Sequence, residues 1–144
     1  MMLTRAGEYA VRCVLYLSLQ DGERIVPKKE IIEAMGLPDA YLTKVAQSLA
    51  KSGLIQIRQG ARGGYRLTRK PVEINLLQVV EAVDGEIFLN ECVMSPDSCL
   101  RSPLCGVHQI WQKARQRLRD TLAEADFEQL GREELCENKS CSTI

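Results

Sequence analysis

Three cysteines and one histidine lie close together in the second half of this chain and could bind a metal. Cys92, Cys99 and Cys105 are spaced C-x6-C-x5-C, and His108 follows one helical turn after Cys105. Three thiolates and an imidazole complete a four-ligand set, and soft thiolates favour zinc or iron–sulfur clusters over hard cations. The spacing therefore predicts a metal site in this segment.

The spacing alone leaves three kinds of site open. Wide spacing in a long loop suits a cluster, which is larger than a single ion, and an imidazole ligand has precedent in cluster chemistry. Zinc is a second possibility, although the paired C-x2-C motifs of many structural zinc sites are absent. Unligated or redox-active thiols are the third. A thiol-dependent oxidoreductase is disfavoured, because such enzymes typically use a C-x-x-C pair and the chain has none.

The chain has the features of a cytoplasmic protein. Residues 1–12 carry three charged side chains and no apolar core, so they do not form a secretory signal. No apolar run approaches the roughly 18 residues that a membrane span needs. In a reducing compartment, clustered cysteines bind metal or do redox chemistry more often than they form disulfides. Cys13 lies apart on an apolar helical face and is interpreted as a small buried hydrophobic residue.

Charge is unevenly distributed, although the net charge is zero. Residues 1–70 hold 12 Lys/Arg and 6 Asp/Glu, a balance of +6, whereas residues 71–144 hold 7 and 13, a balance of −6. A basic half beside an acidic half suggests that only the first meets a polyanion.

The basic half has the pattern of a winged helix-turn-helix. Apolar stripes predict helices over about 4–19, 27–35 and 38–52, and a tight turn at Gly36 joins the second to the third. Two strand-like segments follow, 54–59 and 65–69. The glycines between them supply the positive φ angles of a hairpin turn. These glycines are not a nucleotide-binding loop, because no Lys-Ser/Thr follows them.

Polar side chains on the exposed face of the third helix and arginines of the hairpin are candidates for DNA contacts. These candidates are Tyr41, Thr43, Lys44, Gln47, Ser48, Lys51, Arg58, Arg62 and Arg66. Lysines neutralise phosphates, hydroxyl groups donate hydrogen bonds, and Thr43 and Gln47 are spaced to reach base edges. Arg62, at the hairpin tip, suits a narrow minor groove. The arrangement predicts binding to double-stranded DNA.

The acidic half is expected to form a dimer. Asn75 can cap a helix over 76–83, and the long irregular segment 84–104 is expected to be functional. A helix then runs to about residue 125, and its apolar residues alternate at spacings of four and three, as in a coiled coil. They are Val107, Trp111, Ala114, Leu118, Thr121 and Ala125. The acidic tail from Gly131 is expected to be mobile.

These patterns predict a mainly α fold with a small β wing. A winged helix-turn-helix domain covers residues 1–72, and the long C-terminal dimerisation helix with the cysteine loop covers 73–130. A flexible tail covers 131–144.

The whole pattern resembles the IscR-type winged-helix regulators, a family that includes the nitric-oxide sensor NsrR and the iron regulator RirA. The resemblance covers about residues 1–130. Its motifs are Leu3-Thr4, Gly7-x-Tyr9-Ala10-Val11, Tyr41-Leu42, Gly53-Leu54, Gly60-x-x-Gly63-Gly64-Tyr65-x-Leu67 and the three cysteines before the long helix.

The resemblance implies a homodimeric transcription regulator, a repressor or dual regulator, that binds near-palindromic DNA and holds a cluster at the subunit interface. In the IscR branch, three cysteines and a histidine hold a [2Fe-2S] cluster, and Cys92, Cys99, Cys105 and His108 match that set. NsrR-like members hold a [4Fe-4S] cluster and use an acidic side chain from the partner's first helix. Glu8 occupies that position here, so His108 and Glu8 are rival fourth ligands. A cluster-free, thiol-sensing regulator and a zinc-stapled interaction module remain alternatives.

Two features depart from the family pattern. IscR carries Glu where this chain has Thr43, and that Glu is linked to the exclusion of some DNA sites. Thr43 has no charge to repel phosphate, so the resemblance does not extend to this discrimination. Cys136 and Cys141 lie outside the family's ligand set and are interpreted as incidental thiols of the tail.

Overall fold

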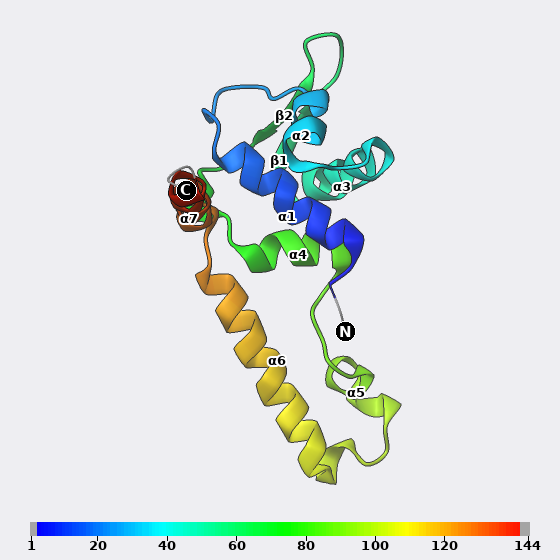
Figure 1. Cartoon of the computed structure of the whole chain (residues 1–144). Helices are drawn as coiled ribbons and strands as arrows, with labels where there is room; N and C mark the ends of the chain where they lie inside the picture. Colours follow the sequence, from blue (N-terminus) through cyan, green and yellow to red (C-terminus); the bar gives the residue numbers. More distant parts are fainter. Residues whose placement is uncertain (1–2, 142–144) are drawn as a thin grey trace.

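Seven helices and a two-stranded sheet make up the described part of the chain (Figure 1). The computed structural model describes residues 3–141, with side chains through residue 137. The helices are α1 (Arg5–Ser18), α2 (Lys28–Met35), α3 (Asp39–Lys51), α4 (Leu76–Asp84), α5 (Glu91–Met94), α6 (Gly106–Glu124) and α7 (Phe127–Cys141), and the strands are β1 (Ile55–Arg58) and β2 (Gly64–Leu67). The predicted fold class, mainly α with a small β wing, is confirmed.

Local capping signals begin or end three of the helices where the sequence predicts. The Thr4 hydroxyl accepts a hydrogen bond from the Gly7 N–H at 3.1 Å and caps α1. Gly36 ends α2 in the left-handed conformation, with φ of 64°. Asn75 begins α4 in a capping box with Gln78.

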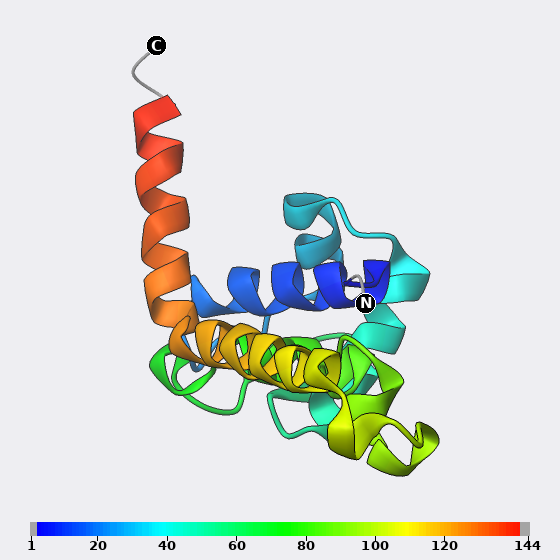
Figure 2. The same cartoon turned by 90° about the horizontal axis from the view of Figure 1, so that it is seen from below.

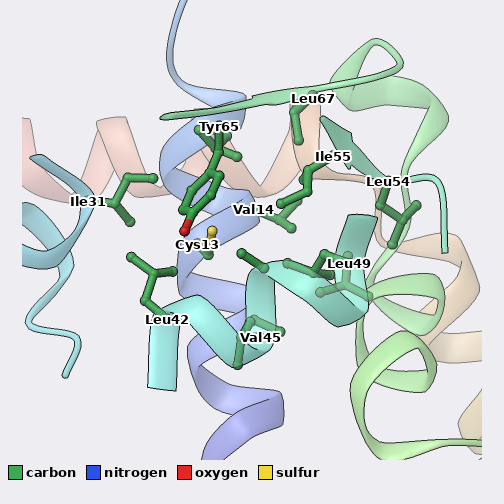
Figure 3. Packing of buried hydrophobic residues seen from close by; sticks show 14 of the residues in the cluster. Cys13, Val14, Ile31, Leu42, Val45, Leu49, Leu54, Ile55, Tyr65 and Leu67 are labelled. Atoms are coloured by element: carbon green, nitrogen blue, oxygen red, sulfur yellow. The ribbon is translucent and has the colours of Figure 1, made fainter. Parts of the chain in front are cut away.

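Apolar side chains from α1, α2, α3 and both strands meet in one core (Figure 3). The predicted inner face of α3 is buried and consists of Leu42, Val45, Ala46 and Leu49. The Tyr65 ring enters the core from β2 and points its hydroxyl towards Cys13. Burial raises the pKa of the Cys13 thiol to about 12, so this cysteine is a neutral core residue, as predicted.

The wing is joined to the segment that leads into α2. Strands β1 and β2 pair antiparallel, and Val26 and Tyr65 exchange backbone hydrogen bonds of 2.9 Å in both directions. A Cβ on Gly64 would collide with the Val26 carbonyl, so glycine is required for this approach. The hairpin therefore has a fixed position beside α2 and α3.

Helix α6 extends from the helical body and carries the cysteine segment at its far end (Figure 1). Arg119 bonds to Glu81 of α4, and Arg115 Nε donates to the Ile87 carbonyl at 2.6 Å. Glu81 also accepts the Ile87 N–H at 3.0 Å. These contacts hold the C-terminal half of α6 on the body. Within residues 3–141, neither α6 nor any other helix is long and apolar enough to cross a membrane.

The C-terminal segment differs from the expected mobile tail. Helix α7 includes Gly131 and runs crosswise to α6 (Figure 2). Phe127 is fully buried, and its N–H donates to the Ile74 carbonyl at 3.0 Å. Both residues belong to the main core, which therefore crosses the boundary predicted at residue 72. The acidic sequence of this segment does not reveal contacts with such distant residues.

An ion pair joins α2 to α1 and to the loop between them. Glu30 accepts hydrogen bonds from Arg24 at 2.6 and 2.8 Å and from the Tyr16 hydroxyl at 2.7 Å. The bonds from Arg24 and then Tyr16 lower the pKa of Glu30 from 4.5 to about 2.

Glu30→Gln is expected to lower the melting temperature at pH 7. A carboxylate with a lowered pKa stabilises the folded state above its unfolded pKa, near 4.5, and this contribution disappears as pH falls through about 2. The variant should therefore lose less stability than the parent between these pH values. Circular dichroism melts at several pH values measure both effects. Glu33→Gln is the matched control, since its pair with Lys29 is exposed and 3.9 Å long; identical behaviour of the two variants would contradict the prediction.

Candidate nucleic-acid interface and metal centre

The outer face of α3 and the wing together expose most of the side chains predicted to contact DNA. Tyr41, Lys44, Gln47 and Lys51 are exposed, and Thr43 and Ser48 are half-buried on the same helix. Arg58 and Arg62 are exposed in the wing. The Tyr41 ring packs edge-on against Tyr9 of α1, with ring centroids 5.4 Å apart.

A groove of about 310 Å³ lies between α3 and the wing. Lys28, Thr43 and Gln47 line its helical side, and Arg58 and the turn glycines line the other. Three residues predicted to contact DNA, Thr43, Gln47 and Arg58, are therefore brought together from two elements.

Arg66 and Thr43, which were predicted to contact DNA, form hydrogen bonds with other side chains of the protein. Arg66 Nε donates to Gln56 Oε1 at 2.7 Å, and the Arg66 guanidinium lies 3.6 Å from Glu23. Arg66 does not line the groove. The Thr43 hydroxyl accepts a hydrogen bond from the Lys28 ammonium. The position of these residues on a helix or strand did not predict their hydrogen-bond partners.

Lys28 is a groove residue that the sequence pattern did not identify. Its Nζ lies 2.6 Å from Asp39 Oδ1, and both residues begin helices of the helix-turn-helix. Its position at the start of α2 could have indicated a role in DNA binding, because the first helix of a helix-turn-helix crosses the DNA backbone.

The predicted metal ligands come from a segment that is more ordered than the expected loop. Cys92 lies in α5, Cys99 follows the 3-10 turn Pro96–Ser98, and Cys105 immediately precedes α6. His108 lies in the first turn of α6 and is 8% exposed. Its Nδ1 is 3.2 Å from Cys92 Sγ.

The structure brings two of the four predicted ligands together, Cys92 and His108. Cys99 is exposed and Cys105 is half-buried. Within residues 3–141, no group of three or more His, Cys, Asp or Glu side chains is close enough to hold a metal ion. The donor set nevertheless fits a thiolate-preferring centre, because a sulfur and an imidazole nitrogen already converge and the other two thiols lie on the adjoining segment.

Ser102 is an unusual polar residue in the cysteine segment. Its hydroxyl is buried and has no hydrogen-bond partner among the described residues. Buried hydroxyl groups normally have a partner, so this oxygen is free to meet an additional polar group or a rearranged backbone.

Glu8, the rival fourth ligand, lies on α1 and pairs with Arg5 at 3.2 Å. It lines an apolar cavity of about 500 Å³ between α1, α4 and α6, together with side chains such as Val11, Val80 and Leu118. Glu8 is therefore a carboxylate at the edge of an open apolar surface.

The α6 seam comprises the predicted dimer residues Val107, Trp111, Ala114, Leu118, Thr121 and Ala125. Val107, Trp111 and Leu118 are large apolar residues and are exposed, whereas Ala114 and Ala125 are half-buried. Ile110 was not predicted but is 61% exposed on the same helix, and Leu100 and Leu104 are almost fully exposed in the adjoining segment. Cys136 is exposed on α7, and the side chain of Cys141 lies outside the described residues.

Similarity to known proteins covers nearly the whole chain. Residues 3–133 match the Rrf2 family, described as iron-dependent transcriptional regulators. The chain is 33% identical over 115 residues to the HTH-type transcriptional regulator NsrR of Shouchella clausii, which covers 79% of this chain and 77% of that protein. It is 35% identical over 118 residues to the HTH-type transcriptional regulator IscR of Aliivibrio salmonicida; the aligned region covers 82% of this chain and 70% of that protein.

A solved structure shares the fold. CymR, the global cysteine regulator of B. subtilis, matches with a TM-score of 0.75 at 22% identity, over 92% of this chain and 98% of that chain. The winged-helix body and the long helix α6 are thus features of a known architecture.

Proposed function

Because this chain belongs to the Rrf2 family of transcriptional regulators, we propose that it is a cytoplasmic, homodimeric repressor whose operator affinity depends on an iron–sulfur cluster. Family membership makes it a DNA-binding regulator and not an enzyme. The observation that carries the cluster proposal is the 3.2 Å approach of His108 Nδ1 to Cys92 Sγ. His108 lies in the first turn of α6, the helix that also carries the exposed seam, so cluster ligation and subunit pairing would both involve α6.

In the proposed complex, α3 is the recognition helix in the major groove, and the wing follows the adjacent minor groove. Lys44 and Lys51 approach phosphates, Gln47 reaches a base edge, and Arg62 enters the minor groove. A two-fold dimer presents two recognition helices, so the operator has two half-sites about one helical turn apart.

The proposed ligands of a [2Fe-2S] cluster are Cys92, Cys99, Cys105 and His108. Three thiolates and a neutral imidazole suit such a centre. When bound, the cluster would make the protein responsive to iron supply, redox state or nitric oxide. The Ser102 hydroxyl in the same segment, which has no hydrogen-bond partner among the described residues, favours a rearrangement of its surroundings on loading. The rival arrangement replaces His108 with Glu8 of the partner subunit around a [4Fe-4S] cluster.

Ligation would regulate DNA binding by favouring one dimer geometry over another. A tenfold change in operator affinity requires about 1.4 kcal/mol of differential stabilisation. Ligand bonds formed when Cys99, which is exposed here, moves to the other ligands would supply differential stabilisation on that scale.

Purification without oxygen tests the proposed function. We expect a coloured protein that contains iron and acid-labile sulfide, and salt-sensitive binding to duplex DNA that changes when the cluster is removed. A colourless, zinc-containing protein would favour the zinc-stapled module. A metal-free protein whose DNA affinity responds to thiol oxidation would favour the thiol-sensing regulator.

His108→Ala is expected to remove most of the iron, sulfide and visible absorption, because it deletes the imidazole nitrogen that lies 3.2 Å from Cys92 Sγ. Glu8→Ala should retain the cluster. Iron and sulfide per protomer, measured without oxygen, distinguish the two ligand sets. Gln109→Ala, at an exposed neighbouring position of α6, is the control. Cluster loss in Glu8→Ala with retention in His108→Ala would favour the [4Fe-4S] arrangement.

A further inference from the structure

Three side chains form a closed hydrogen-bond set at the N-terminal end of α3. The Lys28 ammonium donates to Asp39 Oδ1 at 2.6 Å and to the Thr43 hydroxyl. Thr43 in turn donates to the backbone carbonyl of Asp39 at 3.3 Å. The conformation of the Asp39 carboxylate is therefore restrained by a residue of α2 and, indirectly, by one of α3.

Two members of the set lie in the groove between α3 and the wing, and Asp39 lies beside it at the start of α3. Lys28 and Thr43 line this groove, and Asp39 precedes Thr43 by one helical turn. The Asp39 side chain is 74% exposed, whereas that of Lys28 is 31% exposed. Among the described residues only Oδ1 of this carboxylate accepts a hydrogen bond, so Oδ2 is available to an external donor.

A carboxylate at this place has a specific physical consequence. N-terminal residues of a recognition helix contact base edges, where an uncompensated negative charge is repelled by nearby phosphates. The Lys28–Asp39 pair is neutral, so it displaces no counterions and does not raise affinity for arbitrary DNA. It does supply an acceptor, and carboxylate acceptors pair with the exocyclic amino group of cytosine in the major groove.

We propose that Asp39 reads a cytosine amino group in each half-site and that Lys28 is the positioning residue that holds and neutralises its carboxylate. This inference rests on the proposed DNA-binding mode. It also changes the role predicted for Thr43, whose hydroxyl supports the pair instead of reaching a base edge itself.

Selection from duplexes with a randomised central segment tests the reading of a base. We expect the parent protein to prefer cytosine roughly tenfold at one symmetry-related position of each half-site, the scale of a single base-edge contact. Asp39→Ala should lose the preference at that position and keep the others. Glu33→Ala, which removes an exposed carboxylate that pairs with Lys29 and not with Lys28, is the matched control.

Two outcomes would overturn the inference in different ways. Identical base preferences for the parent and Asp39→Ala would remove Asp39 from base reading while leaving the proposed function intact. Failure of the parent protein to enrich any sequence would contradict the DNA-binding mode itself, and the inference with it.

Salt dependence tests the role of Lys28 separately. Asp39→Asn leaves the Lys28 charge uncompensated, so the slope of log K against log salt on a mixed-sequence duplex should steepen by about 1.8 per dimer, 0.9 for each lysine. Lys28→Met should weaken binding severalfold at low salt and reduce the cytosine preference. An unchanged slope in Asp39→Asn would show that Lys28 does not face the DNA. Thermal melts establish that both variants are folded.

Discussion

Trp111→Glu is expected to convert the proposed dimer into a monomer and to lower its affinity for an operator duplex by at least about 100-fold, or about 2.8 kcal/mol. Trp111 is exposed on α6 beside Val107 and Ile110, where an isolated chain presents large apolar side chains to water. Pairing of two such faces buries the indole. A carboxylate at this position would be buried without a partner, which costs several kcal/mol.

Analytical ultracentrifugation and DNA titration of the same preparation measure the two effects. Gln112→Glu introduces the same charge at the next exposed position of α6 and should remain dimeric. Circular dichroism should show that both variants keep their helical content. A dimeric Trp111→Glu protein with parental DNA affinity would exclude the α6 seam as the subunit interface.

The second large effect is expected in the wing. Replacing Arg58 and Arg62 together with alanine should weaken binding to duplex DNA at least about 100-fold and lower its salt slope by about 3.6 per dimer, 0.9 for each of four charges. Arg58 lines the groove beside α3, and Arg62 is exposed in the turn held by the glycines. Both guanidinium groups can therefore approach the phosphates or the minor groove without rearrangement of the hairpin.

Fluorescence anisotropy over a series of salt concentrations provides both quantities. The matched control is the double replacement of Arg117 and Arg132, which removes equal charge from exposed positions on α6 and α7. Its slope should stay close to the parental value, since phosphate contact and not total charge determines counterion release. A wing variant with the parental slope would place the hairpin outside the DNA contact.

Local sequence signals were sufficient to predict the helix-turn-helix and the wing. Thr4, Gly36 and Gly60 act on their own neighbours, so their effects can be predicted without a tertiary structure. The position of the wing was not predictable in this way. It depends on the backbone pairing of Val26 with Tyr65, which lie far apart in the chain.

The candidate sites show the same limit. The cysteine spacing indicated the segment in which Cys92 and His108 meet, but the one-turn spacing from Cys105 to His108 did not indicate that Cys92 would be the cysteine beside the imidazole. Spacing did not predict helix α7, whose first residue is buried by contacts with distant elements. Helical position likewise assigned Thr43 to DNA, while its partner Lys28 comes from a separate helix and left no periodic signal.

The attachment of α6 near its C-terminal end makes the helix a lever. Its side-chain bonds to the body come from Arg115 and Arg119, and Gly106 lies roughly 20 Å before Arg119 along the axis, at about 1.5 Å per residue. A tilt of about 10° around the Arg119 contact moves the start of α6 by about 3 Å. A small rotation of α6 against α4 therefore moves Cys105 by a large distance. Conversely, a displacement imposed at the cysteines becomes a smaller displacement, with a correspondingly greater force, at the contact between α6 and α4.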